Sequence, residues 1–89
     1  MEKDEGLSIT LEARGNAYGS FKSGSGISQY LKGSKDMGTA KLSHSHSEAL
    51  DMIFSKISRI INGDANHSDS WHDIAGYALL AEKEVVNEQ

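Results

Sequence analysis

The sequence contains no cysteine and no proline, and only 7% of its 89 residues are aromatic. Without cysteine the chain can form neither a disulfide framework nor a thiolate metal site, which are common ways to stabilise a small domain. A chain of this length forms a single domain, residues 1–89, and buries little more than about 60% of the surface that its unfolded state exposes. We therefore expect a thin core and a homo-oligomer.

Long apolar segments and blocks of positive charge are also missing. The longest apolar run, residues 74–81, is broken by Gly76 and is far too short to span a bilayer. The first five residues are mostly charged, unlike a signal peptide. Nine lysines and arginines stand against thirteen acids, a net charge of −4, which argues against binding to duplex nucleic acid. We expect a cytoplasmic protein that does not contact a membrane.

The second half of the sequence has the periodicity of two long helices. Ser45-x-x-Glu48 has the pattern of a capping box, and Asn62-Gly63 is a stop signal, so we predict a helix over residues 45–62. Ser68 or Asp69 is the predicted cap of a last helix over residues 69–86. Strand-like alternation is absent, which predicts an all-α fold built on this long antiparallel pair. The predicted buried stripe of the first helix consists of Leu50, Ile53, Phe54, Ile57, Ile60 and Ile61.

The first half is less regular. We predict a short helix from Ser8 to Gly15 and another around residues 27–31 that ends at Gly33. Residues 15–26 hold four of the nine glycines and are predicted to form a turn-rich connection anchored by two aromatic residues, Tyr18 and Phe21. A Gly-x-Gly here could cradle phosphate, but no strand precedes it. Residues 1–6 and 87–89 are expected to fray.

Asp73 is the carboxylate that the surrounding pattern explains least, because it lies within the mostly apolar surface of the last helix. An ionised carboxylate removed from water without a partner costs several kcal/mol. It therefore needs a cation, hydrogen-bond donors or a solvent-filled cleft.

Two pairs of acids, each separated by about one helical turn, suggest a metal site. Glu48 and Asp51 lie on one predicted helix, and Asp69 and Asp73 lie on the next. Helical bundles bind Mg²⁺ or Mn²⁺ with carboxylates arranged in this way. Ordinary roles also exist: Glu48 can complete the capping box, Asp69 can cap its helix, and Asp51 can be a solvated acid near a helix N-terminus. Because Glu48 and Asp51 lie away from the apolar stripe, the site also requires another helix or a second subunit over that face.

Three blocks of the sequence resemble a family of small proteins encoded by tailed bacteriophages and prophages. The blocks run from Leu11 to Phe21 (LEARGxxYGxF), from Glu48 to Asp64 (EALDMIxxKIxRIxNGD) and from Asp69 to Ala78 (DSWHDIAGYA). This resemblance implies a protein that acts in the cytoplasm of an infected bacterium.

That family in turn resembles the MazG-like all-α nucleoside triphosphate pyrophosphohydrolases, which bind Mg²⁺ through two acidic helix motifs. The likeness implies Mg²⁺ or Mn²⁺ held by Glu48, Asp51, Asp69 and Asp73, with Glu48 and Asp73 catalytic. The motif is altered, because Ser70 stands three residues before Asp73 where the family has an acid.

In such an enzyme a water molecule attacks the α-phosphorus of a nucleotide and releases pyrophosphate. Lys56 and Arg59 could then hold the phosphates, while Trp71 or Tyr18 contacts the base. Lys56 can equally be a flank of the buried stripe, and Trp71 a core anchor. Two alternatives to an enzyme remain open: a non-catalytic accessory protein that binds a nucleotide or a host protein, and a structural module without a ligand.

Overall fold

The computed structural model describes the backbone of residues 2–86 and the side chains of residues 6–86. It contains four α-helices, α1 (Glu2–Tyr18), α2 (Phe21–Gly33), α3 (His44–Asn62) and α4 (Ser68–Lys83), and a short 3₁₀ helix, η1 (Ser34–Met37). These described residues include no strand, so the predicted all-α class is confirmed. The expected fraying of residues 87–89 lies outside the described part of the chain.

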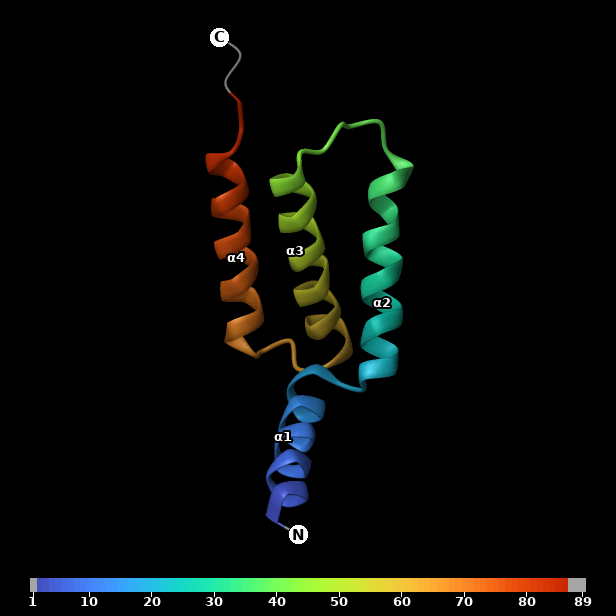
Figure 1. Ribbon diagram of the computed structural model, residues 1–89, viewed down its shortest axis with the longest axis vertical. Coiled ribbons are helices and arrows are strands. Elements are labelled where there is room, and N and C mark those ends of the chain that lie inside the picture. Colours follow the sequence, from blue (N-terminus) through green and yellow to red (C-terminus); the bar gives the residue numbers. More distant parts are fainter. Residues whose placement is uncertain (1, 87–89) are drawn as a thin grey trace.

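Helices α2, α3 and α4 lie side by side in a single layer with α3 in the middle, and α1 projects from one end of it (Figure 1). The predicted antiparallel pair is present as α3 and α4. The molecule measures 61 × 24 × 24 Å, and its radius of gyration is 16.0 Å. A compact chain of this length would have a radius of gyration of about 12 Å. The fold is therefore extended, and over the described residues it has no helix long and apolar enough to cross a membrane.

The helix starts differ from the predicted ones. Ser43 is the N-cap of α3, and its Oγ accepts a hydrogen bond of 3.1 Å from the amide of His46. The predicted Ser45–Glu48 capping box is therefore wrong, because Ser45 already lies inside the helix. The α4 N-cap is His67, whose side chain makes no capping bond, and the predicted caps Ser68 and Asp69 lie in the first turn.

The glycine-rich segment is mostly helical, which corrects the predicted turn-rich connection. Helix α1 continues through Gly15 to Tyr18, and α2 begins at Phe21, so only two residues join them. Ser20 supplies the helix start that the sequence interpretation overlooked, since its Oγ accepts from the amide of Ser23 at 3.2 Å. The predicted end of the second helix at Gly33 is confirmed.

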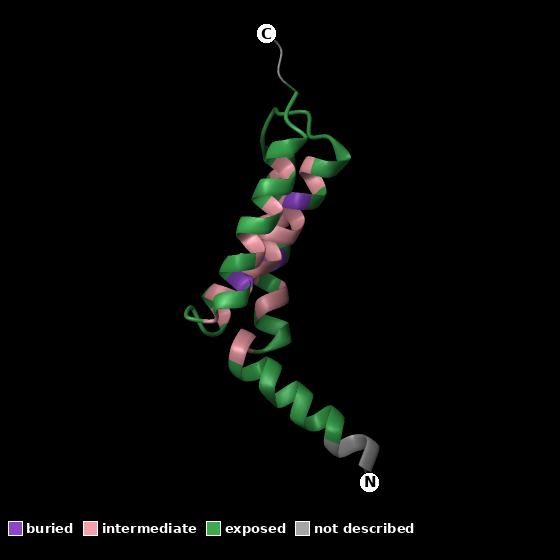
Figure 2. Cartoon of the chain, turned by 90° about the vertical axis from the view of Figure 1, so that its left-hand side faces the viewer, coloured by how far each residue is buried: buried purple, intermediate pink, exposed green. Residues whose placement is uncertain are grey.

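The interior of the layer is thin, as the chain length predicts. Ala49 is the one buried hydrophobic residue among those described, and the other buried residues are Ser28, Ser58 and Ser70. Figure 2 shows the sparse buried positions within a mostly exposed or half-buried chain. The predicted buried stripe of α3 is therefore wrong for the single chain: five of its members are half-buried, and Ile61 is 64% exposed.

Candidate functional site

The surroundings of α3 define two open faces of the layer. Helices α2 and α4 lie on opposite sides of α3 (Figure 1). α3 contacts α2 through a hydrogen bond between the hydroxyls of Ser28 and Ser55 (3.4 Å), and contacts α4 through the Lys56–Asp73 ion pair. At 100° per residue, two further sides of α3 remain between these contacts. The apolar face is the side of the layer where α3 presents Leu50, Phe54, Ile57 and Ile61. The charged face is the opposite side, where α3 presents Glu48 and Arg59.

Hydrogen bonds to backbone carbonyls join the end of α1 to the end of α3. The Asn62 side-chain amide donates to the carbonyls of Tyr18 (3.0 Å) and Ser20 (2.9 Å). The amide of Asp64 donates to the Ala17 carbonyl at 2.8 Å. Gly19 adopts a φ of +77°, and a Cβ there would collide with the Asn62 backbone. The junction therefore depends on glycine and fixes the position of Tyr18.

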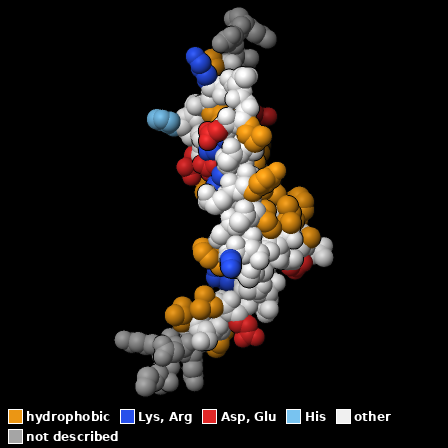
Figure 3. All heavy atoms as spheres, turned by 90° about the vertical axis from the view of Figure 1, so that its right-hand side faces the viewer, with side chains coloured by type: hydrophobic (Ala, Val, Ile, Leu, Met, Phe, Trp, Pro, Cys, Tyr) orange, Lys and Arg blue, Asp and Glu red, His pale blue; other side chains and the backbone are white. Residues whose placement is uncertain are grey.

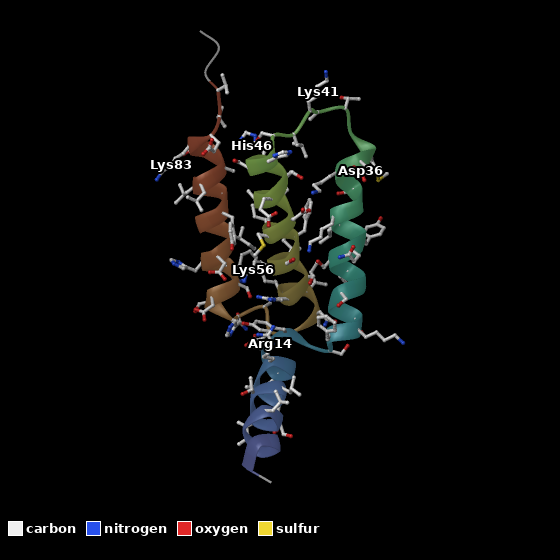
Figure 4. All side chains as sticks on the ribbon, viewed as in Figure 1. Arg14, Asp36, Lys41, His46, Lys56 and Lys83 are labelled. Atoms are coloured by element: carbon white, nitrogen blue, oxygen red, sulfur yellow. The ribbon has the colours of Figure 1, made fainter. Side chains whose placement is uncertain are left out.

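Both arginines of the chain lie over the ring of Tyr18. The Arg14 guanidinium carbon is 5.1 Å from the ring centroid and that of Arg59 is 4.7 Å from it. The His67 ring meets Tyr18 edge-on, with centroids 5.4 Å apart. Cation–π contacts hold the guanidinium groups while leaving their N–H edges able to bind oxygen atoms. Figure 4 shows Arg14 at the junction of α1 with the layer.

A pocket of about 560 Å³ lies beside this junction, between the end of α1, α2 and α3. Its lining carries three cationic side chains, those of Arg14, Lys32 and Arg59, and among the described residues that line it there is no aspartate or glutamate. Because the whole chain has a net charge of −4, this concentration of positive charge is local. The remaining lining residues are Leu11, Gly15, Tyr18, Gly19, Ser20, Phe21, Gly24, Ser25, Ser28, Gln29, Ser55 and Ser58.

Asp73 has a partner on the neighbouring helix. Lys56 Nζ lies 2.9 Å from Asp73 Oδ2, and the Lys56 side chain is only 13% exposed (Figure 4 shows it on the α4 side of α3). The hydrogen bond from Lys56 lowers the pKa of the Asp73 carboxyl below its ordinary value, with smaller contributions from His72 and Arg59. The Asp73 side chain is 41% exposed, so the predicted removal of this carboxylate from water is wrong, and its partner is a lysine. Lys56 is an ion-pair partner on the α4 side of α3 and does not line the pocket.

Asp51 lies on the α2 side of α3, where it pairs with a lysine. Lys35 Nζ lies 2.6 Å from Asp51 Oδ1 and also donates to the Ser47 hydroxyl at 2.8 Å. Asp51 therefore faces the α2 side, as does Ser55 one turn further on. Since α3 itself separates this side from α4, Asp51 and Asp73 lie across a helix about 10 Å thick.

The four predicted metal ligands do not converge in the single chain. Glu48 is exposed, and the Asp69 side chain is 81% exposed and 3.8 Å from His67 Nε2. No group of three or more acidic or histidine side chains within the described residues is close enough to hold a metal ion. This donor arrangement does not fit a Mg²⁺ site within one chain, and the predicted Mg²⁺ or Mn²⁺ binding stays a prediction.

Trp71 lies away from the predicted phosphate ligands. Its indole N–H donates to the Ala65 carbonyl at 2.7 Å, and the residue is 55% exposed. Trp71 and Asp73 are two positions apart on α4, about 200° around the helix, so Trp71 lies on the apolar face and Asp73 on the charged face. Of the predicted nucleotide contacts, the structure brings Arg59 and Tyr18 together in the pocket and separates Lys56 and Trp71 from it.

The sequence interpretation missed Arg14 and the serines of α2 as pocket residues. A usable signal was present, since Arg14 and Arg59 are the chain's two arginines and each is three or four residues from a Tyr-Gly or Asn-Gly stop. The assumption that residues 15–26 form a loop hid this arrangement.

A known family model matches nearly the whole of this sequence. The chain belongs to the DUF6378 family, described as a domain of unknown function, whose model matches residues 5–85. Neither the search of curated proteins nor the search of solved structures returned a match.

Proposed function

We propose that this protein binds a phosphorylated ligand, specifically a nucleotide, in the pocket between the end of α1, α2 and α3. The observation that carries this proposal is the grouping of Arg14, Lys32 and Arg59 around a pocket without a carboxylate. Such a site attracts anions, and guanidinium groups favour phosphate because they donate two parallel hydrogen bonds.

The phosphate end of the ligand is assigned to the two arginines and the start of α2. Tyr18 holds both guanidinium groups in place, which reduces the entropy lost on binding. The first turn of α2 contains no acid, and its free amide groups favour a negative charge. Serine hydroxyls along the α2–α3 contact supply further donors.

The base end is assigned to Phe21. Both arginines already occupy the Tyr18 ring, whereas Phe21 lines the pocket and is 89% exposed. An exposed aromatic ring at the rim of a cationic pocket provides a stacking surface that accepts any base.

The biological setting belongs to the proposal as well. The resemblance to small proteins of tailed phages and prophages supports a role for nucleotide binding in an infected bacterial cell. A protein with this pocket can act as a non-catalytic accessory protein.

A second candidate is a metal-dependent nucleoside triphosphate pyrophosphohydrolase. One observation favours it: the Asp73 side chain is 41% exposed and lines a second, smaller pocket on α4. Because Asp73 is paired with Lys56 and the other acids lie apart, this candidate requires ligands that a single chain does not assemble.

Calorimetric titration with nucleoside triphosphates and deoxynucleoside triphosphates tests the proposal. Arg59→Gln should weaken nucleotide binding by about 10- to 100-fold, the value of a charge-assisted hydrogen bond, and Arg14→Gln should act in the same direction. Lys83→Gln is the matched control, because Lys83 lies on α4 at the far end of the layer (Figure 4). Equal affinities in all three variants, or no binding to the native protein, would refute the nucleotide site.

The same samples separate the two candidates. Pyrophosphate release in the presence of Mg²⁺ or Mn²⁺, abolished by Asp73→Asn without loss of helicity, would establish the enzyme. Binding without turnover would leave the accessory role.

A further inference from the structure

The single layer leaves far more surface exposed than a folded chain of this mass normally does. Its accessible surface is 7037 Å² for a mass of 9.6 kDa, whereas monomeric proteins of that mass expose about 5,100 Å². The excess is about 1,900 Å². This excess on one chain is larger than the roughly 800 Å² that each partner buries in a standard interface.

The apolar face of α3 is only partly covered: Ile61 is 64% exposed, and Leu50, Phe54 and Ile57 are half-buried. Leu50, Phe54, Ile57 and Ile61 follow one another at spacings of four, three and four residues, the a/d pattern of helices that pack against helices. None of these positions carries a charge. Figure 3 views the layer from its α2 side. In the middle of the molecule, hydrophobic side chains gather on one face of the layer and charged side chains on the other.

The neighbouring helices extend this surface on both sides of α3. By the same helical geometry, α2 adds Ile27 and Leu31, and α4 adds Trp71 and Ile74. Helix α1 leaves this surface open, because it contacts the layer only near the α1–α3 junction and leans towards the charged face (Figures 2 and 3).

We propose that a second copy of this chain covers the apolar face, so that two three-helix layers pack face to face with α3 against its counterpart. The occupant is a second copy because the shortage of buried surface belongs to the folded chain itself: Ala49 is the only buried hydrophobic residue among those described. A surface required for folding needs a partner present whenever the chain is present, and another copy meets that condition. Two-fold pairing uses the same patch on both copies and closes the assembly.

This dimer leaves the nucleotide pocket open, because the pocket lies on the charged face. The two proposals are therefore independent, and failure of one does not affect the other.

Light-scattering mass measurement over a wide range of protein concentration tests the dimer. The native chain should have twice the mass of 9.6 kDa. Ile61→Glu should raise the dissociation constant at least about 100-fold, because it places an unpaired carboxylate in an apolar interface. Leu79→Glu is the matched control: Leu79 is 60% exposed, like Ile61 at 64%, but lies on the outer edge of α4. A folded native monomer at high concentration, or dissociation by Leu79→Glu with none by Ile61→Glu, overturns the proposal.

Two further measurements keep the test decisive if Ile61→Glu does not fold. The unfolding midpoint of the native protein should rise with protein concentration, because association and folding are linked. Trp71, the only tryptophan, lies on the apolar face, so its fluorescence should shift to longer wavelength on dilution. A concentration-independent midpoint together with an unchanged emission spectrum overturns the proposal in either case.

Discussion

The two sides by which α3 contacts its neighbours are built from different kinds of side chain. Towards α2, α3 presents small or polar residues at helical spacing, namely Ser47, Asp51, Ser55, Ser58 and Asn62. Towards α4 it presents Ala49, Ile53 and Ile60, interrupted by Lys56. The α3–α4 contact therefore gains more from apolar burial, whereas the α2–α3 contact depends on hydrogen bonds and close backbone approach.

This difference explains where the pocket is. Serine and glycine are too small to fill the space between α2 and α3, so a cavity with hydroxyl-bearing walls remains beside the arginines. The side chains between α3 and α4 are larger. A smaller pocket of about 300 Å³ lies on α4 and is lined by His72, Asp73, Gly76, Tyr77 and Leu80. The weaker contact is the one that can accommodate a ligand.

The largest effect on the α2–α3 contact is expected from Gly19→Ala. Holding a non-glycine residue at φ +77° costs about 1–3 kcal/mol, and the added Cβ also collides with the Asn62 backbone. Thermal or denaturant unfolding should show a loss of stability of about 3 kcal/mol, with α1 and α2 released before α3 and α4. Gly26→Ala provides the control, since Gly26 lies within α2 with no atom within 4 Å of the place that a Cβ would take, and should stabilise by about 0.5–1 kcal/mol. Equal effects at both glycines would show that the junction does not hold α2 in place.

Much of this architecture was predictable from the sequence. The periodicity of residues 45–86 indicated the all-α class and the α3–α4 pair, because 3.6-residue spacing is a strong local signal. The N-caps were misplaced by one or two residues. At α3 both Ser43 and Ser45 can cap a helix, and at α4 the cap is His67, whose side chain makes no capping bond. The glycines of α2 suggested a loop, yet Gly24 and Gly26 lie inside a helix, and Gly24 lies close to Ser58 and Asn62 of α3.

The site was less predictable, because it depends on which side of α3 each helix covers. The sequence placed Glu48 and Asp51 together on a side away from the apolar stripe. In the structure Asp51 lies at the α2 contact and Glu48 on the charged face, a division of only tens of degrees that periodicity cannot resolve. The pairing of Asp73 with Lys56 likewise required the register of α4 against α3.

A smaller effect is expected at the α3–α4 contact from the Lys56–Asp73 pair. Because the pKa of folded Asp73 lies below its ordinary value of 3.8, the stabilisation from this group is present above pH 3.8. It is lost as the pH falls through the lower folded-state pKa. Asp73→Asn should therefore reduce stability at neutral pH, leaving the half-buried Lys56 unpaired, and should flatten the acid limb of a stability-against-pH profile. Glu12→Gln, at an exposed position on α1, should leave that limb unchanged. A more stable Asp73→Asn protein would favour the interpretation of this chain as a structural module without a ligand.

The smallest effect is expected from removing the hydroxyl contact between α2 and α3. Ser28 and Ser55 are 3.4 Å apart, a long and weak hydrogen bond, and replacing both by alanine leaves no buried hydroxyl without a partner. The double variant should change the free energy of unfolding by less than about 1 kcal/mol, whereas Ile53→Ala on the opposite side of α3 should cost about 2 kcal/mol. If the serine pair proved as costly as Ile53, the α2–α3 contact would be a stabilising core in its own right. The pocket beside it would then be a rigid part of the fold, and a ligand would gain little further stability by closing it.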